Sequence, residues 1–121
     1  MSLQALWRTG FVAYFLLLSW QLLTPVTIVS AGSWDKLIHF SGFFVLAVLA
    51  MLAARNVSVN KLAILLIVYA ALTEILQHFI PGRSFSVLDW VADTIGIIFA
   101  LLVSSKAIER FPFLVKYVNS V

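Results

Sequence analysis

The chain has 121 residues, of which 63% are hydrophobic and 11% charged, and its mean hydropathy is +1.07. A soluble domain of this size could not cover so much apolar surface with so few polar groups, so the composition indicates a single integral membrane domain. The formal net charge of +3 does not indicate nucleic-acid binding, because the basic residues are scattered at the ends of apolar runs. The lack of cysteine excludes disulfides and thiolate metal sites.

Four apolar runs approach the roughly 20 residues that a helix needs to cross a bilayer. They cover about residues 10–29, 37–54, 62–80 and 85–103, and short segments with turn-forming residues separate them. These short connections predict an all-α polytopic membrane protein, built as a compact antiparallel bundle of four transmembrane helices. Residues 104–121 alternate basic and apolar side chains, which predicts a tail at the membrane surface.

The basic residues predict the orientation of this bundle. Six of the eight Lys and Arg residues lie at the two ends of the chain and in the second connection, and the other two lie in the first and third connections. The positive-inside rule therefore places both termini and the tail in the cytoplasm. The first and third connections are expected on the outer side.

The two halves of the chain repeat a polar pattern. The first copy contains Gln21, Pro25, Asp35, His39 and Gly42, and the second contains Gln77, Pro81, Asp89, Asp93 and Gly96. This repeat suggests two duplicated helical hairpins, in which the second and fourth helices run in the same direction. Few positions match, so chance is the alternative explanation.

Four of the five acidic residues lie near the ends of apolar runs, and all four of these ends are expected on the outer side of the membrane. They are Asp35, Glu74, Asp89 and Asp93. Charged groups in such positions are costly and indicate a functional site unless structure explains them. Helix capping explains part of the presence of Asp35 and Asp89, which are expected in first turns. A structural alternative for Arg83 is that it neutralises Asp89 or Glu74. Glu74, near a helix C-terminus, and Asp93, too deep to cap, are the strongest functional candidates.

Three chemical roles fit this cluster. His39, Glu74, Asp89 and Asp93 offer ligands for a divalent cation, but no dense metal-binding motif supports this role, so neither a metal nor a cofactor is predicted. Glu74 with His39 could transfer protons. Lys36 and Arg83 could bind a phosphate or carboxylate group.

The run Asp35-Lys36-Leu37-Ile38-His39-Phe40, followed by Glu74-x-x-Gln77, Pro81-x-Arg83, Asp89 and Gly96, resembles the VanZ-like family over roughly residues 33–103. The resemblance implies a bacterial cytoplasmic (inner) membrane protein connected with the cell envelope. It also implies a polar site at Asp35, Lys36, His39, Glu74, Gln77, Arg83 and Asp89. Asp93 stands where the family is expected often to have asparagine. The founding member is associated with low-level resistance to the glycopeptide teicoplanin, without a defined enzymatic activity.

Three functions remain open. The favoured one is a non-enzymatic protein whose outward-facing polar pocket binds a lipid-linked or cell-wall anionic group through Arg83 and Lys36. The alternatives are an intramembrane enzyme acting on a lipid phosphate, with Glu74 or His39 as general acid or base, and a small proton-coupled transporter. The expected partners are membrane lipids, a lipid-linked cell-wall precursor and, for a transporter, a second copy of the chain.

Overall fold

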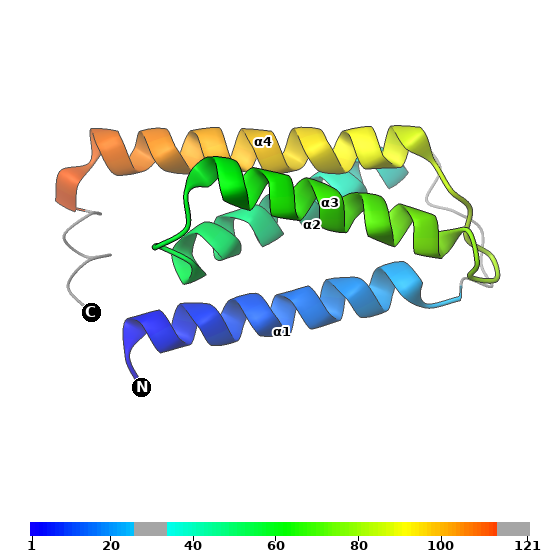
Figure 1. The fold of residues 1–121 in the computed structure, drawn as a ribbon, viewed down its shortest axis with the longest axis horizontal. Coiled ribbons are helices and arrows are strands. Elements are labelled where there is room, and N and C mark those ends of the chain that lie inside the picture. The colour runs from blue at the N-terminus through cyan, green and yellow to red at the C-terminus, as the bar shows by residue number, and fades with distance from the viewer. Residues whose placement is uncertain (26–33, 114–121) are drawn as a thin grey trace.

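A computed structural model describes residues 1–25 and 34–113, which form four helices and no strand. The helices are α1 (Leu3–Leu23), α2 (Asp35–Ala53), α3 (Val59–Gln77) and α4 (Val87–Arg110). They run alternately in opposite directions, so α2 and α4 point the same way (Figure 1). The predicted all-α antiparallel bundle is confirmed.

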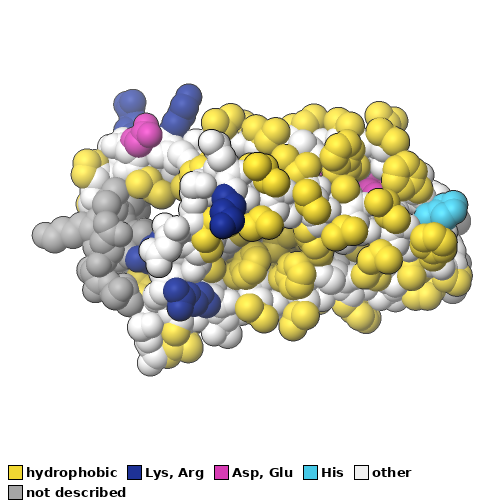
Figure 2. All heavy atoms as spheres, in the orientation of Figure 1, with side chains coloured by type: hydrophobic (Ala, Val, Ile, Leu, Met, Phe, Trp, Pro, Cys, Tyr) yellow, Lys and Arg dark blue, Asp and Glu magenta, His cyan; other side chains and the backbone are white. Residues whose placement is uncertain are grey.

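Within the described residues, α2, α3 and α4 are long and apolar enough to cross a membrane. The 19 residues of α2 or of α3 extend about 29 Å at 1.5 Å per residue, which matches the hydrocarbon core of a bilayer. The 21-residue α1 does not belong to this set, but it packs along α2 and also contacts α3. Hydrophobic side chains cover most of the visible flank of the bundle (Figure 2).

The helix ends differ in places from the predicted runs. α1 begins at Leu3 rather than near residue 10, because the Ser2 hydroxyl caps it by accepting a hydrogen bond from the Ala5 amide. α4 continues to Arg110, so the first part of the predicted tail is helical. Residues 26–29 of the first predicted run and residues 114–121 of the tail lie outside the described residues.

The core is centred on the interface between α2 and α4, which make the most extensive contact in the bundle. Phe43 and Leu46 of α2 and Ile97 and Ala100 of α4 are fully buried there. Gly96 allows this close approach, because a side chain at that position would collide with the backbone carbonyl oxygen of Phe40. Gly96, a position of the repeated polar pattern, therefore permits the close packing of α2 and α4.

The bundle has two unlike ends. Basic side chains gather at the end where α1 begins and α4 finishes, which we call the basic end (Figure 2). The opposite end carries the N-termini of α2 and α4 and the C-termini of α1 and α3 (Figure 1). We call it the acidic end, because it carries Asp35, Glu74, Asp89 and Asp93.

Candidate functional site

His39 is the centre of a polar cluster at the acidic end. Its Nδ1 atom lies 2.8 Å from Asp93 Oδ1 and 3.8 Å from Glu74 Oε1. Its Nε2 atom lies 3.5 Å from Asp89 Oδ2 and 3.9 Å from Asp35 Oδ1. The structure thus brings the four carboxylates, drawn from three helices, around one buried imidazole.

Glu74 and Asp93 form the deep side of the cluster. Glu74 is 1% exposed and Asp93 is 0% exposed. Glu74 Oε1 and Asp93 Oδ2 are buried without a hydrogen-bond partner among the described residues. Buried polar atoms are normally hydrogen-bonded, so these two oxygens are exceptions that need an explanation.

Glu74 also helps to start α4. The Ser86 hydroxyl caps α4 by accepting a hydrogen bond from the Asp89 amide at 3.2 Å, which is one of the two bonds of a capping box. The backbone N–H of Ser86, which Asp89 would bind in a complete capping box, instead donates to Glu74 Oε2 at 3.2 Å. Helix capping within α3 did not explain Glu74, and the structure gives it a partner outside that helix, the backbone N–H of Ser86.

Lys36 neutralises the shallow side of the cluster. Its ammonium group forms ion pairs with Asp89 Oδ1 and, at 3.4 Å, with Asp35 Oδ2. These pairs use the two carboxylates that lie in the first turns of α4 and α2. Lys36 is therefore a partner of the cluster rather than a separate anion-binding group above it.

Arg83 and Gln77 hold the C-terminal end of α1. The Arg83 guanidinium donates from Nε to the Thr24 carbonyl oxygen at 3.1 Å and from Nη2 to that of Gln21. Gln77 Nε2 donates to the Leu22 carbonyl oxygen at 2.9 Å. These bonds satisfy carbonyl groups that the end of a helix leaves without partners. Arg83 forms no ion pair with Asp89 or Glu74 within the described ranges, so the structure does not support the alternative that it neutralises one of them.

A pocket of about 280 Å³ opens beside His39. Its lining is partly polar and partly apolar. The polar residues are Gln21, Asp35, His39 and Arg83, and the apolar residues are Leu18, Leu22, Ile38 and Phe43. Glu74, Asp89 and Asp93 are not among these lining residues. The eight predicted site residues thus lie at one end of the bundle, but only three of them line the pocket.

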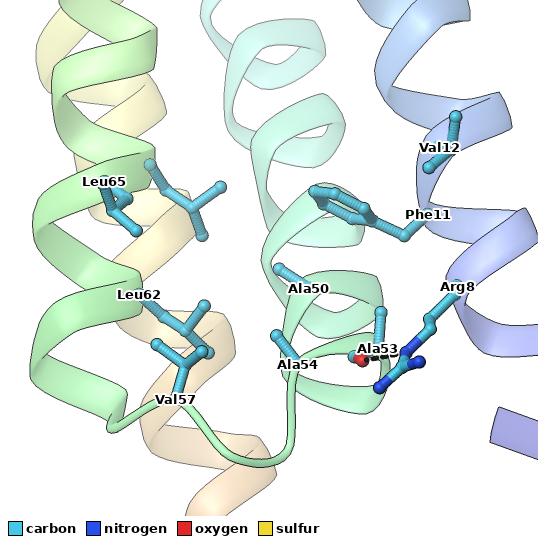
Figure 3. A pocket seen from close by; sticks show the side chains of 10 residues that line it. Arg8, Phe11, Val12, Ala50, Ala53, Ala54, Val57, Leu62 and Leu65 are labelled. Carbon is cyan, nitrogen blue, oxygen red and sulfur yellow. Dashed lines mark hydrogen bonds between the residues drawn. The ribbon is translucent and has the colours of Figure 1, made fainter. Parts of the chain in front are cut away.

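A larger groove of about 440 Å³ lies at the basic end between α1, α2 and α3. Figure 3 shows Phe11, Ala50 and Leu62 on its walls and Arg8 at its edge, donating to the Ala53 carbonyl oxygen. The walls are almost entirely apolar, so lipid chains can fill the groove without specific recognition. The acidic end is therefore the better candidate for a functional site.

A sequence model of the VanZ/LLP1 family matches residues 4–108, which include parts of all four helices. The chain belongs to the VanZ/LLP1 family. The resemblance carried by the Asp35–His39 and Glu74–Asp89 motifs is thereby confirmed, and the match extends through α1. No curated protein and no solved structure matches the chain.

Proposed function

We propose that this VanZ/LLP1 family protein is a non-enzymatic protein of the bacterial cytoplasmic membrane that binds a lipid-linked cell-wall precursor through its anionic headgroup. The mixed lining of the pocket beside His39 carries this proposal. Leu18, Leu22 and Phe43 offer an apolar wall for a lipid chain, and Arg83 offers a positive charge. Pockets of this type place a few polar groups where they fix the orientation of a largely apolar ligand.

Arg83 is the proposed anion ligand. Its bonds to the Gln21 and Thr24 carbonyl oxygens hold the guanidinium in place but do not neutralise its charge. The acidic residue of the pocket lining, Asp35, is paired with Lys36. A cation that is already held in position binds a phosphate or carboxylate at a lower entropic cost.

The pocket is proposed to face outward, with both termini in the cytoplasm. The support is the charge distribution, because Arg8, Arg55, Lys61, Lys106 and Arg110 all lie toward the basic end. Positive charge on connections and termini marks the cytoplasmic side of a membrane protein.

Native mass spectrometry of the purified protein with polyprenyl phosphate tests this proposal. We expect the phosphate to bind, the uncharged polyprenol to bind more weakly, and Arg83→Gln to lower phosphate affinity at least about tenfold through the lost charged hydrogen bonds. Lys61→Gln removes the same charge at the basic end and serves as the control. Equal binding of phosphate and polyprenol, or equal effects of the two variants, would refute recognition by Arg83.

A link to teicoplanin follows from the same proposal. If the protein binds a cell-wall precursor, its expression should change the teicoplanin susceptibility of a host, and Arg83→Gln should remove that change. The minimal inhibitory concentration of teicoplanin is measured for hosts that express the wild-type protein and for hosts that carry an empty vector. Equal values would show that this chain does not confer resistance.

One observation favours an enzyme as the second candidate. The 2.8 Å contact between His39 and Asp93 resembles the arrangement in which a buried carboxylate orients a histidine base. Incubation with a polyprenyl diphosphate, followed by assay of released phosphate, tests this alternative. A transport role is less well supported, because Phe43, Leu46 and Ile97 fill the bundle below the cluster.

A further inference from the structure

Within the described residues, no Lys or Arg side chain pairs with the deep carboxylates Glu74 and Asp93. Lys36 pairs with Asp35 and Asp89, and Arg83 binds carbonyl groups of α1. Their closest titratable partner is His39 of α2, and the carboxylates of Asp35 and Asp89, which are also close, add further negative charge. Two carboxylates fully removed from solvent in a membrane bundle carry a high desolvation cost unless a cation or proton compensates them.

Both deep carboxylates have a buried oxygen without a partner, and both lie close to His39. Glu74 Oε1 and Asp93 Oδ2 are buried and accept no hydrogen bond from the described residues. Glu74 Oε1 is directed at His39 Nδ1, 3.8 Å away, and the other Asp93 oxygen lies 2.8 Å from the same nitrogen. One nitrogen and two carboxylates from three helices therefore converge.

The spacing of these atoms suits a bound metal ion. Donor atoms of His39, Glu74 and Asp93 all lie within 4.8 Å of one another. The separations of 2.8 and 3.8 Å bracket the roughly 3.0–3.4 Å expected between ligands that are about 2.1 Å from one ion in octahedral or tetrahedral geometry. Small side-chain adjustments would bring the three donors to one ion, and water molecules would have to supply the remaining ligands.

The surroundings also resemble the outer shell of a metal site. A histidine that binds a metal through one ring nitrogen usually donates its other N–H to a carboxylate, and Asp89 Oδ2 lies 3.5 Å from His39 Nε2. Glu74 Oε2 is fixed by the Ser86 amide, which leaves Oε1 available. The ligands are thus oriented before any ion binds.

We infer that His39, Glu74 and Asp93 form a binding site for one divalent cation of the Zn²⁺ or Mn²⁺ class. Two carboxylates and a neutral imidazole carry two negative charges, which one such ion neutralises. The mixed nitrogen and oxygen donors fit these ions better than Mg²⁺ or Ca²⁺, which prefer oxygen alone. A second group of possible ligands, Asp35, His39 and Asp89, is less suitable because Lys36 already binds both of its carboxylates.

Direct metal analysis of the detergent-purified full chain tests this inference without any lipid ligand. We expect inductively coupled plasma mass spectrometry and native mass spectrometry to show one Zn²⁺ or Mn²⁺ per chain after loading with each metal alone. We also expect the loaded protein to unfold at a higher temperature, because binding to the folded state stabilises it. Glu74→Gln and Asp93→Asn should lower metal affinity at least about 100-fold, since even the loss of an outer-shell partner costs about 10–100-fold.

The variants are chosen so that a loss of metal binding cannot be explained by a loss of folding. A glutamine at position 74 can still accept from the Ser86 amide, and an asparagine at position 93 can still bond to His39. Glu109→Gln removes an exposed carboxylate at the basic end and should bind metal as the wild type does. Thermal unfolding without metal verifies that each variant is folded.

Three results would overturn the inference. No bound metal in the loaded wild type would mean that Glu74 and Asp93 are compensated by protons instead. Metal binding that survives Glu74→Gln but is lost in Asp35→Asn would place the ion in the other ligand group. Equal loss in Glu109→Gln would indicate non-specific binding. Each of these results leaves the phosphate test of Arg83 unaffected, because that test measures lipid binding.

Discussion

Among single residues, Lys36 forms ion pairs with two carboxylates of the acidic end, Asp35 and Asp89. It pairs with Asp89, whose side chain is 11% exposed, while its own side chain is 45% exposed. We predict that Lys36→Gln destabilises the protein by about 1 kcal/mol, a value reduced for solvent screening of the exposed lysine. Thermal unfolding in detergent at low and high salt measures this effect, which should shrink as salt rises.

Lys36→Arg is the matched variant for this prediction. It keeps the positive charge and should retain most of the stability, whereas Lys61→Gln at the basic end should have little effect. If Lys36→Gln unfolds at the same temperature as the wild type at both salt concentrations, the ion pairs with Asp35 and Asp89 contribute no net stability.

For single residues, the sequence was enough to locate the polar cluster at the acidic end, but it did not identify the hydrogen-bond partners of the residues in the cluster. The four-residue spacings of Asp35 with His39 and of Asp89 with Asp93 were sufficient to place each pair on one helix face. The partners of Arg83 could not be read in this way, because they are backbone carbonyls of α1 about 60 residues earlier in the chain. A backbone acceptor leaves no residue-type signal in a sequence.

Among the helices, the contact between α2 and α4 depends on Gly96. A methyl group there would collide with the Phe40 carbonyl oxygen, and a backbone atom cannot move aside as a flexible side chain can. We predict that Gly96→Ala costs about 1–3 kcal/mol through overpacking and also displaces His39 from Asp93. Thermal unfolding measures the first effect, and the metal affinity of the folded variant measures the second.

Gly10→Ala is the control for this prediction. Gly10 is in the interior of α1, and a side chain added there would meet no atom within 4 Å among the described residues beyond its chain neighbours and the nearby backbone of its own helix. Alanine favours a helix by up to about 1 kcal/mol over glycine, so this variant should be as stable as the wild type or more so. If both substitutions change the unfolding temperature equally, the close contact between Gly96 and Phe40 does not determine the stability of the bundle.

For the whole molecule, the short connections were enough to predict the antiparallel order of the helices. The start of α1 was not predicted, because Trp7 and Arg8 lower the local hydropathy and so hide a helix that begins earlier. Hydropathy measures how readily a segment enters lipid. The start of this helix is instead determined by the Ser2 cap and by the hydrogen bonds from Gln4 and Arg8 to the Ala53 carbonyl oxygen.

The orientation of the bundle can be tested with single cysteines, since the native chain has none. Asn56 lies between α2 and α3 at the basic end, and Ser84 lies between α3 and α4 at the acidic end; both side chains are exposed. Because the excess of Lys and Arg favours a cytoplasmic basic end, we predict that a membrane-impermeant maleimide labels Ser84→Cys in intact cells and labels Asn56→Cys only after lysis. The reverse pattern would place the pocket beside His39 in the cytoplasm, where it could not bind a ligand on the outer surface.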